Sequence, residues 1–531
     1  MKRNDNLPLN IKERHNARTS LLASVGVLAV LILLFNQLDY RLIRKPAQDA
    51  RKKAEITRQK KENEENTPVT STASVIAVGD NLYHQSLIDA GESDSGDWNY
   101  DKIYTHVLDA IQSADVKMID QETVFTTDHD SVSSYPSFAT PTEVGDAIIK
   151  AGFNVVESAT NHIDDFGYDF LADTLNFWKT KYPDVTLIGI HDSQEDADTV
   201  KIREVNGIKI AFLDYTYGTN VGGIEGRDYM IDMFDKTKIT TMIKKAKEQA
   251  DCIIFVAHWG TEDETMPSEY EKQWAAYLME QGVNVIIGGH PHVLQPYGRL
   301  SDGKGNEAVV FYSLGNFVST QQKLEELLGG MASFTIQKSE LNGKTSIQIL
   351  TPEVKPLVMH YNSDSGEFGP YMLDDYTEEL AAQNGVRNYI GDVFTLANLK
   401  SKYNEIMSMN VTPSTGTDLL DVTIDTDLNM IDSSGNIVED NDSITAEQYY
   451  AQKGVDINSE DSSDSSSGDS SYDDSSSDDS SYDDSSYDDG SDDSSYDDSS
   501  YDDYSDDSSY DDSSYDDSSY DSSDDGSYDE E

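Results

Sequence analysis

The sequence predicts an α/β fold in which buried strands alternate with helices. Residues 252–257 and 283–287 are short apolar runs bounded by polar residues, a pattern typical of parallel strands covered on both faces. Between these runs, Ser268 and Glu271 stand at capping-box spacing, apolar residues recur at helical spacing, and Gly282 ends the helix. A strand, a helix and a second strand make one right-handed crossover unit, the building block of an α/β sheet.

The rest of the chain repeats this order. Further strands are expected at residues 74–78, 116–119, 155–156, 185–190, 208–213 and 308–312, and helices at 142–151 and 167–182. Residues 331–360 alternate like a hairpin that closes the unit, and residues 375–407 have the periodicity of helix.

Polar side chains follow seven of the predicted strands. Because ligands of open α/β sheets bind at the carboxyl ends of the strands, we expect these side chains to meet at one edge. They are Asp80, Glu122, Asn161 with His162, Asp214, His258, His290 with His292, and Asn316.

The histidines among these residues indicate a metal site. A single histidine after a strand is more often a structural residue, but two imidazoles that flank Pro291 just after Gly288-Gly289 suit a divalent metal with nitrogen and oxygen ligands. An amide oxygen beside His162 suits a site that needs a neutral ligand and a proton donor. Glu122 could serve as a ligand that bridges two metals, or its side chain could simply be solvated. Four other histidines follow no strand and are expected to be ordinary surface or loop residues: His106, His129, His191 and His360.

The N-terminus predicts a membrane anchor. Residues 1–19 form a short basic segment and residues 20–38 a transmembrane segment, since residues 19–38 supply about the 20 residues needed to span a bilayer. No small-x-small cleavage site follows, which favours an anchor over a cleaved signal peptide. Residues 39–73 are expected to be a charged stalk, helical in part. Seven basic residues at 41–58 exceed the five before the apolar segment, and this bias alone would keep the main domain in the cytoplasm.

The C-terminal part of the chain is strongly acidic. The formal net charge is −61, and residues 460–531 hold 30 acidic residues with no Lys or Arg, which leaves −31 for the rest. This balance excludes nucleic-acid binding. We expect a main domain at 74–360, a helical extension at 361–408, a linker at 409–454 and a disordered Ser/Asp/Tyr repeat tail at 455–531. The tail is either a soluble brush or a weak sink for divalent ions. The single Cys252 excludes an intrachain disulfide.

These motifs resemble those of the CapA family of poly-gamma-glutamate capsule synthesis proteins, a branch of the calcineurin-like metallophosphoesterase fold. The resemblance covers about residues 74–360 and implies an α/β sandwich. The matching segments, in the order of that family, are Gly79-Asp80-Asn81, the Glu122 segment, Ala159-Thr160-Asn161-His162 with Asp165 and Gly167, His258-Trp259-Gly260, Gly289-His290-Pro291-His292, and Tyr312-Ser313-Leu314-Gly315-Asn316-Phe317.

The resemblance also implies a centre with one or two divalent ions, of Mn, Fe, Zn or Mg. Its implied ligands are Asp80, Glu122, Asn161, His258, His290 and His292, with His162 as general acid and with Trp259 and Asn316 as substrate contacts. The first motif departs from the wider phosphoesterases, because Leu82 stands where their Asp-x-His motif has its histidine, and His84 is a possible substitute. Glu122 also replaces the usual second motif, which leaves the number of metals open.

Two functions of different class follow from the resemblance. In the first, the protein is a metal-dependent hydrolase on poly-gamma-glutamate, peptidoglycan peptide or a phosphoester. In the second, it is a non-catalytic binding component of a polymer synthesis and export complex. Both imply a single-pass protein of the cell membrane in a Gram-positive bacterium, with the main domain outside, an anionic polymer or cell-wall substrate, and other capsule synthesis or export subunits as partners.

Overall fold

The computed structural model describes residues 11–93, 95–417, 419–421, 423–424 and 430–431. The chain divides into two compact units, Met1–Ser459 and Glu460–Glu531. The predicted tail at 455–531 lies outside the described residues, as does most of the predicted linker at 409–454.

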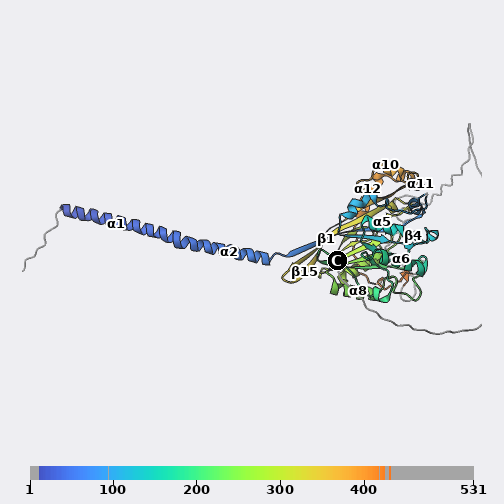
Figure 1. Ribbon diagram of the computed structural model, residues 1–531, viewed down its shortest axis with the longest axis horizontal. Coiled ribbons are helices and arrows are strands. Elements are labelled where there is room, and N and C mark those ends of the chain that lie inside the picture. Colours follow the sequence, from blue (N-terminus) through green and yellow to red (C-terminus); the bar gives the residue numbers. More distant parts are fainter. Residues whose placement is uncertain (1–10, 94, 418, 422, 425–429, 432–531) are drawn as a thin grey trace, which may run out of the picture. The chain divides into compact units, whose positions relative to one another are not determined.

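A helical segment precedes the folded domain. It consists of α1 (Ile11–Asp39), a π-helical turn η1 (Tyr40–Arg44) and α2 (Lys45–Glu65), shown in blue in Figure 1. From residue 14 onward, the side chains of α1 are exposed, apart from Asp39. Most side chains of residues 21–38 are apolar and lie on every face of the helix. Residues 14–61 therefore form one helix that is long and apolar enough to cross a membrane, by length and composition.

The first sheet has eight strands and joins distant parts of the chain. Strands β1, β2, β5 and β6 are parallel, with β6 at one edge of the sheet. On the other side of β1, the strands β14, β15 and β16 are antiparallel, and β13 pairs with the end of β1. The strands are β1 (Val69–Asn81), β2 (Val116–Gln121), β5 (Val155–Glu157), β6 (Thr186–Ile188), β13 (Asn316–Val318), β14 (Leu328–Leu341), β15 (Lys344–Asn362) and β16 (Glu367–Met372).

The second sheet has six strands, in the order β11-β12-β10-β9-β8-β7. The four inner strands are parallel, and β7 and β11 close the two edges in antiparallel pairing. The strands are β7 (Lys201–Val205), β8 (Ile208–Thr216), β9 (Cys252–His258), β10 (Val285–Gly289), β11 (Tyr297–Ser301) and β12 (Glu307–Phe311). Two further pairs are small: β3 (Val124–Thr126) with β4 (Ala139–Pro141), and β17 (Thr423–Ile424) with β18 (Met430–Ile431).

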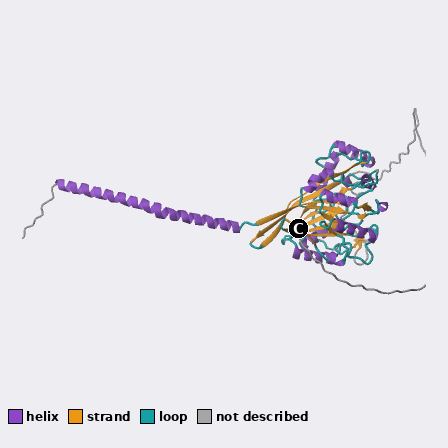
Figure 2. Cartoon of the chain, viewed as in Figure 1, coloured by secondary structure: helices purple, strands orange, loops and turns teal. Residues whose placement is uncertain are grey.

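The two sheets pack face to face, with helices outside them (Figure 2). Alternate residues of a strand point to opposite faces, so Ile254 and Val256 of β9 join the core shared with Ile119 of the first sheet. The neighbouring residues Ile253 and Phe255 instead belong to a second core, which they form with α8 (Lys236–Gln249) and α9 (Glu269–Gln281). The expected α/β sandwich is confirmed.

Helices complete the domain. In α9 the Ser268 hydroxyl and the Glu271 carboxylate form the predicted capping box, and Gly282 ends the helix in the left-handed conformation. The helices are α3 (Gln85–Gly91), α4 (Leu108–Gln112), α5 (Glu143–Ala151), α6 (Gly167–Lys181), α7 (Gln194–Ala197), α8 (Lys236–Gln249), α9 (Glu269–Gln281), α10 (Glu378–Gln383), α11 (Arg387–Ile390) and α12 (Leu396–Met407), with short 3-10 turns η2 (Thr105–Val107), η3 (His129–Ser131), η4 (Glu325–Leu327) and η5 (Gly391–Val393).

Two of the histidines expected to be ordinary surface or loop residues are buried: His191 lies in a loop, as expected, but inside the domain, whereas His360 lies in a strand, so the expectation was wrong for His360. The His191 ring is hydrogen bonded to Asp232 at 2.7 Å, and the His360 ring to the Tyr376 hydroxyl at 2.9 Å. His191 lies in an irregular segment after β6, and His360 lies in β15 between β14 and β16; both pack against the core, a contact that local sequence does not reveal. His106 and His129 are partly exposed, as expected.

Candidate metal centre

Three carboxylates of the first sheet form the acidic half of the site. Asp80 is the second-last residue of β1 and stands in register with Asp120, the second-last residue of β2. Glu122 follows two residues after Asp120, a spacing that keeps its side chain on the same side of the extended chain. All three side chains are buried. Strand register therefore brings together carboxylates that are about 40 residues apart in the sequence.

Three histidines of the second sheet form the opposite half. His258 is the last residue of β9 and pairs with Gly289, the last residue of β10. A Cβ atom at Gly289 would stand 2.9 Å from Asp80 Oδ1, so glycine allows β10 to approach the carboxylate. His290 and His292 follow with φ of 94° and 59°, conformations that non-glycine residues rarely adopt. Such strain is typical of functional sites.

The side-chain atoms of these two halves meet. His292 Nδ1 lies 2.9 Å from Asp80 Oδ2, and His258 Nδ1 lies 3.3 Å from Asp120 Oδ2. Glu122 Oε1 stands 3.9 Å from Nε2 of both His258 and His292. Two groups in the described part of the chain each have ligand atoms within 4.8 Å of one another: Asp80 with Glu122 and His292, and Asp80 with Asp120 and His258. Asp80 is common to both.

Unsatisfied polar atoms in this cluster test whether a metal fits. Asp120 Oδ1, both carboxylate oxygens of Glu122 and His290 Nδ1 are buried and have no hydrogen-bond partner among the described residues. Burying carboxylate oxygens without a donor is costly, and divalent cations held by the cluster would satisfy those of Asp120 and Glu122. Imidazole nitrogens and carboxylate oxygens are the ligands that Zn, Mn and Fe accept. The residues therefore fit one or two divalent ions, with Asp80 able to bridge them.

The pKa values of the cluster follow from its burial. Burial raises the pKa of Asp120, and the neighbouring Asp80 charge raises it further. Burial raises the pKa of Glu122 to about 7 and lowers the pKa of His258 to about 4. For His292, burial lowers the pKa, but the Glu122 charge and the Asp80 hydrogen bond outweigh this and leave it well above its usual value. Metal binding must therefore displace protons from this cluster.

The loop after β5 carries Asn161 and His162. The Asp214 carboxylate accepts hydrogen bonds from the backbone N–H of Ser158 at 2.9 Å and of Ala159 at 3.0 Å, which fixes the start of this loop. Asn161 Oδ1 lies 2.8 Å from His258 Nε2, at the edge of the cluster. Asp214, which the sequence placed at the same rim, thus positions the loop and does not enter the cluster.

His162 is held by a carboxylate of its own loop. Its Nδ1 lies 2.7 Å from Asp165 Oδ2 and 3.1 Å from Asn220 Nδ2. Burial lowers the pKa of His162, but the hydrogen bond that the ring donates to Asp165 and the charge of Glu122 raise it above its ordinary value overall. The side chain keeps 9% of its surface exposed. His162 therefore combines a raised pKa with some access to solvent, as a proton donor requires.

Trp259 and Asn316 were the expected substrate contacts. Trp259 is fully buried and its Nε1–H donates to Tyr312 O at 2.9 Å, so its placement gives it a packing role. The reason is strand alternation, which turns Trp259 away from the face of His258. Asn316 stands in register with Asp80, and its Oδ1 is buried without a partner among the described residues. Asn316 therefore stays a predicted contact.

The sequence interpretation passed over Asp120, Glu157 and Asn220. Asp120 shares a face with Glu122, so the alternation of the strand could have identified it. Glu157 ends β5 in register with Asp120, and its Oε1 is buried without a partner among the described residues. Asn220 lies in the loop after β8, 58 residues from His162 in the sequence, and no local pattern pairs the two residues.

The fold and the site define an α/β sandwich with a buried centre of histidine and carboxylate side chains. Residues 74–321 match the family of the bacterial capsule synthesis protein PGA_cap, and part of the chain is similar to CapA proteins of two Bacillus species. Over 180 residues the chain is 31% identical to the capsule biosynthesis protein CapA of Bacillus anthracis, an alignment that covers 33% of this chain and 42% of that protein.

Other known proteins are similar as well. Over 171 residues the chain is 34% identical to the PGA biosynthesis protein CapA of Bacillus subtilis (strain 168), which covers 32% of this chain and 43% of that one. The chain thus spans less than half the length of these two relatives. Among solved structures, a phosphatase from Mycoplasma pneumoniae is 14% identical, with a TM-score of 0.31, over 54% of this chain and 95% of that one.

Proposed function

We propose that this chain is a divalent-metal-dependent hydrolase of capsule polymer biosynthesis or export, anchored in the membrane by residues 20–38. The observation that carries the proposal is the pairing of His162 with Asp165 beside the buried cluster. A platform that only binds polymer needs the geometry of the cluster but has no use for a histidine whose pKa is raised by a dedicated carboxylate. The proposed substrate is an amide-linked capsule polymer of the poly-gamma-glutamate class.

Each residue has a role in this proposal. Bound divalent ions would polarise the reacting group and activate a water. Asp80 would hold both ions, with Glu122 and His292 on one side and Asp120 and His258 on the other. Asp165 accepts from the Nδ1–H of His162, which leaves Nε2 as the nitrogen that passes a proton to the leaving group. Asp214 holds the loop that carries His162, and Asn161 would supply a neutral oxygen ligand.

Metal analysis and an activity screen of the full-length protein test this proposal. The purified protein, loaded with Mn²⁺ or Zn²⁺, would be offered poly-gamma-glutamate, peptidoglycan peptides and an aryl phosphate ester. We expect cleavage of the polymer, and we expect His162→Ala to keep its metal while turnover falls on the order of 10²-fold. His129→Ala changes a partly exposed histidine and serves as the control. A metal-loaded wild type that cleaves none of the substrates would support the non-catalytic binding component instead.

The membrane topology needs a separate test, because the flanking charges and the family resemblance disagree. We propose that the main domain faces outward, and protease added to intact cells should then digest it. Protection of the domain until the cells are lysed would reverse this topology and uphold the positive-inside argument.

A further inference from the structure

The loop after β8 reaches the segment that holds Asn161 beside the metal centre. At the start of this loop, the backbone N–H of Tyr217 donates to His258 O at 2.9 Å. Further along, the backbone N–H of Asn220 donates to Asn161 O, also at 2.9 Å. The loop therefore connects the end of β9 in the second sheet to the loop after β5 in the first sheet, and it brings Asn220 next to Asn161.

Asp164 fixes this loop on both sides of Asn220. Its buried carboxylate accepts a hydrogen bond from the Thr219 hydroxyl and another from the backbone N–H of Gly223, each at 2.7 Å. Gly222 and Gly223 have φ of 99° and 87°, a conformation that favours glycine, and they allow the chain to turn back toward Asp164. The side chain of Asn220 is exposed, but its backbone is held in place by these bonds.

The contact with Asn220 orients the Asn161 side chain, because a carboxamide has two unlike ends. The oxygen can bind a metal ion, whereas the nitrogen carries two hydrogens and cannot, and a half-turn of the amide exchanges them. Asn161 Oδ1 lies 2.8 Å from His258 Nε2 at the edge of the cluster, and Asn161 Nδ2 donates to Asn220 Oδ1 at 3.3 Å. An oxygen acceptor pairs only with the N–H₂ end, so it favours the orientation in which the Asn161 oxygen faces the cluster.

The Asn220 side chain also lies against the proposed proton donor. Its Nδ2 is 3.1 Å from Nδ1 of His162, the nitrogen whose proton Asp165 accepts at 2.7 Å. One exposed carboxamide therefore contacts both the expected neutral ligand and the expected proton donor. A change at Asn220 reaches two residues of the site at once.

We propose that Asn220 is a positioning residue that holds the Asn161 amide with its oxygen toward the metal centre. Its Oδ1 accepts from the Asn161 N–H₂ group, so the amide cannot turn its nitrogen toward the ions without breaking this hydrogen bond. The inference rests on the metal centre of the proposed function, but it does not depend on hydrolysis.

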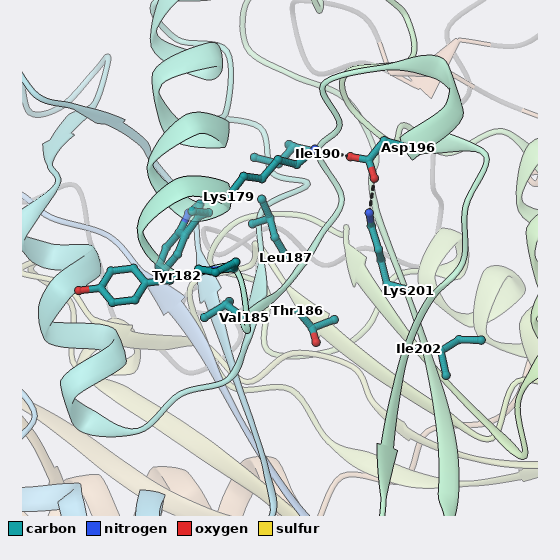
Figure 3. Close-up of a pocket in the computed structure, with 11 residues that line it drawn as sticks. Lys179, Tyr182, Val185, Thr186, Leu187, Ile190, Asp196, Lys201 and Ile202 are labelled. Carbon is teal, nitrogen blue, oxygen red and sulfur yellow. Dashed lines mark hydrogen bonds and ion pairs between the residues drawn. The ribbon is translucent and has the colours of Figure 1, made fainter. Parts of the chain in front are cut away.

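The cavity beside α6 and β7 offers no second site of this kind. It has a volume of about 290 Å³, and Figure 3 shows Asp196 between Lys179 and Lys201 in its wall. Both lysines pair with this carboxylate, so their charges are already used within the protein.

Metal affinity of the full-length protein tests the proposal without any measurement of turnover. Mn²⁺ affinity is measured by competition with a chelator, and the visible spectrum of the Co²⁺-loaded protein reports the ligands around the ion. Asn220→Ala should weaken Mn²⁺ binding about 10- to 100-fold and change the Co²⁺ spectrum, as loss of a partner that orients a metal ligand does. Asn220→Leu, which is similar in size but has no polar atoms, should do the same. Asn220→Asp keeps an oxygen acceptor for Asn161 and should bind Mn²⁺ nearly as tightly as wild type.

A substitution of the ligand itself gives the sharper comparison. In Asn161→Asp, the carboxylate presents an oxygen in either orientation, so it needs no partner to orient it. Adding Asn220→Ala to this variant should therefore cost less than about 3-fold in Mn²⁺ affinity, although the same change costs about 10- to 100-fold when Asn161 is present. A loss of loop stability common to both backgrounds cancels in this cycle. Equal losses of affinity in the two backgrounds would overturn the proposal.

Two control variants separate positioning from general effects. Val221→Ala changes the exposed neighbour of Asn220 in the same loop, and Asn398→Ala removes an exposed carboxamide of α12 that donates to Val393 O at 2.8 Å. Neither should change Mn²⁺ affinity. Wild-type affinity in both Asn220→Ala and Asn220→Leu would overturn the positioning role and leave the proposed hydrolysis standing. A wild type that binds Mn²⁺ and shows the coupling, but cleaves no substrate, would uphold the positioning role and refute only the proposed function.

Discussion

Glu122→Gln should make the metal-free protein more stable at alkaline pH, although it removes a proposed metal ligand. Both carboxylate oxygens of Glu122 are buried without a hydrogen-bond partner among the described residues. Ionising this side chain in the folded protein is therefore unfavourable unless a cation is bound. Glutamine has nearly the same shape and does not ionise, so the variant avoids that cost and gives up the metal.

The size of the effect follows from the pKa of Glu122, which burial raises to about 7 from the ordinary 4.5. The folded state then binds more protons than the unfolded state between these two values, so stability falls as pH rises through this window. At 1.36 kcal/mol for each pKa unit, the difference corresponds to about 3 kcal/mol lost by pH 8. We expect Glu122→Gln to recover about this amount at pH 8 and little at pH 4.

Thermal melting of the full-length protein in EDTA, at pH 4 and pH 8, measures this difference, and the same melts with Mn²⁺ measure the response to metal. Wild type should gain stability from Mn²⁺ by mass action, and Glu122→Gln should gain much less. Glu157→Gln is the matched control, because Glu157 is also a buried carboxyl with an unpartnered oxygen but belongs to neither ligand group of the cluster. The Glu157→Gln variant should be more stable than wild type in EDTA at pH 8, and Mn²⁺ should still raise its melting temperature as much as that of wild type. If Glu122→Gln melts at or below the wild-type temperature in EDTA at pH 8, the electrostatic reasoning fails.

Three further predictions concern the site and the tail. Asp165→Asn keeps a hydrogen-bond acceptor for His162 but removes the negative charge that raises the pKa of His162. Turnover should therefore fall about 10- to 100-fold at pH 8 and less at lower pH. A pH-rate profile with an unchanged alkaline limb would contradict this. His290→Ala should lower both the metal content and the Mn²⁺-dependent rise in melting temperature. His106→Ala changes a partly exposed ring and should lower neither. Equal metal stoichiometry in the wild type and both variants would exclude His290 as a ligand. Deletion of residues 460–531 should leave melting temperature and metal content unchanged, because no aliphatic residue follows Ile457; a large drop in either would show that this segment docks on the domain.

Much of the fold was predictable because it is encoded locally. The buried strands β9, β10 and β12 are runs of apolar residues, and the ends of α9 are set by Ser268 and Gly282. The edge strands β7 and β11 were not predicted, since an edge strand with one solvated face has no such run. The predicted helix at 375–407 is divided into α10, α11 and α12, and residues 384–386 and 391–395 interrupt it.

The sequence by itself determined which residue types stand at the ends of the strands, because hydrophobic runs and glycine turns fix where each strand stops. Only the tertiary structure decided which of these residues share a site. The pairing of Asp80 with Asp120 depends on strand register, and the contact of Asp80 with His292 depends on two sheets packed face to face. The same packing buried Trp259 and brought Asn220 against Asn161, from which it is 59 residues away in the sequence. Such contacts form because folding buries apolar surface over the whole domain. Each segment contributes only a part of that free energy, so the sequence of one segment does not show which other segment it will pack against.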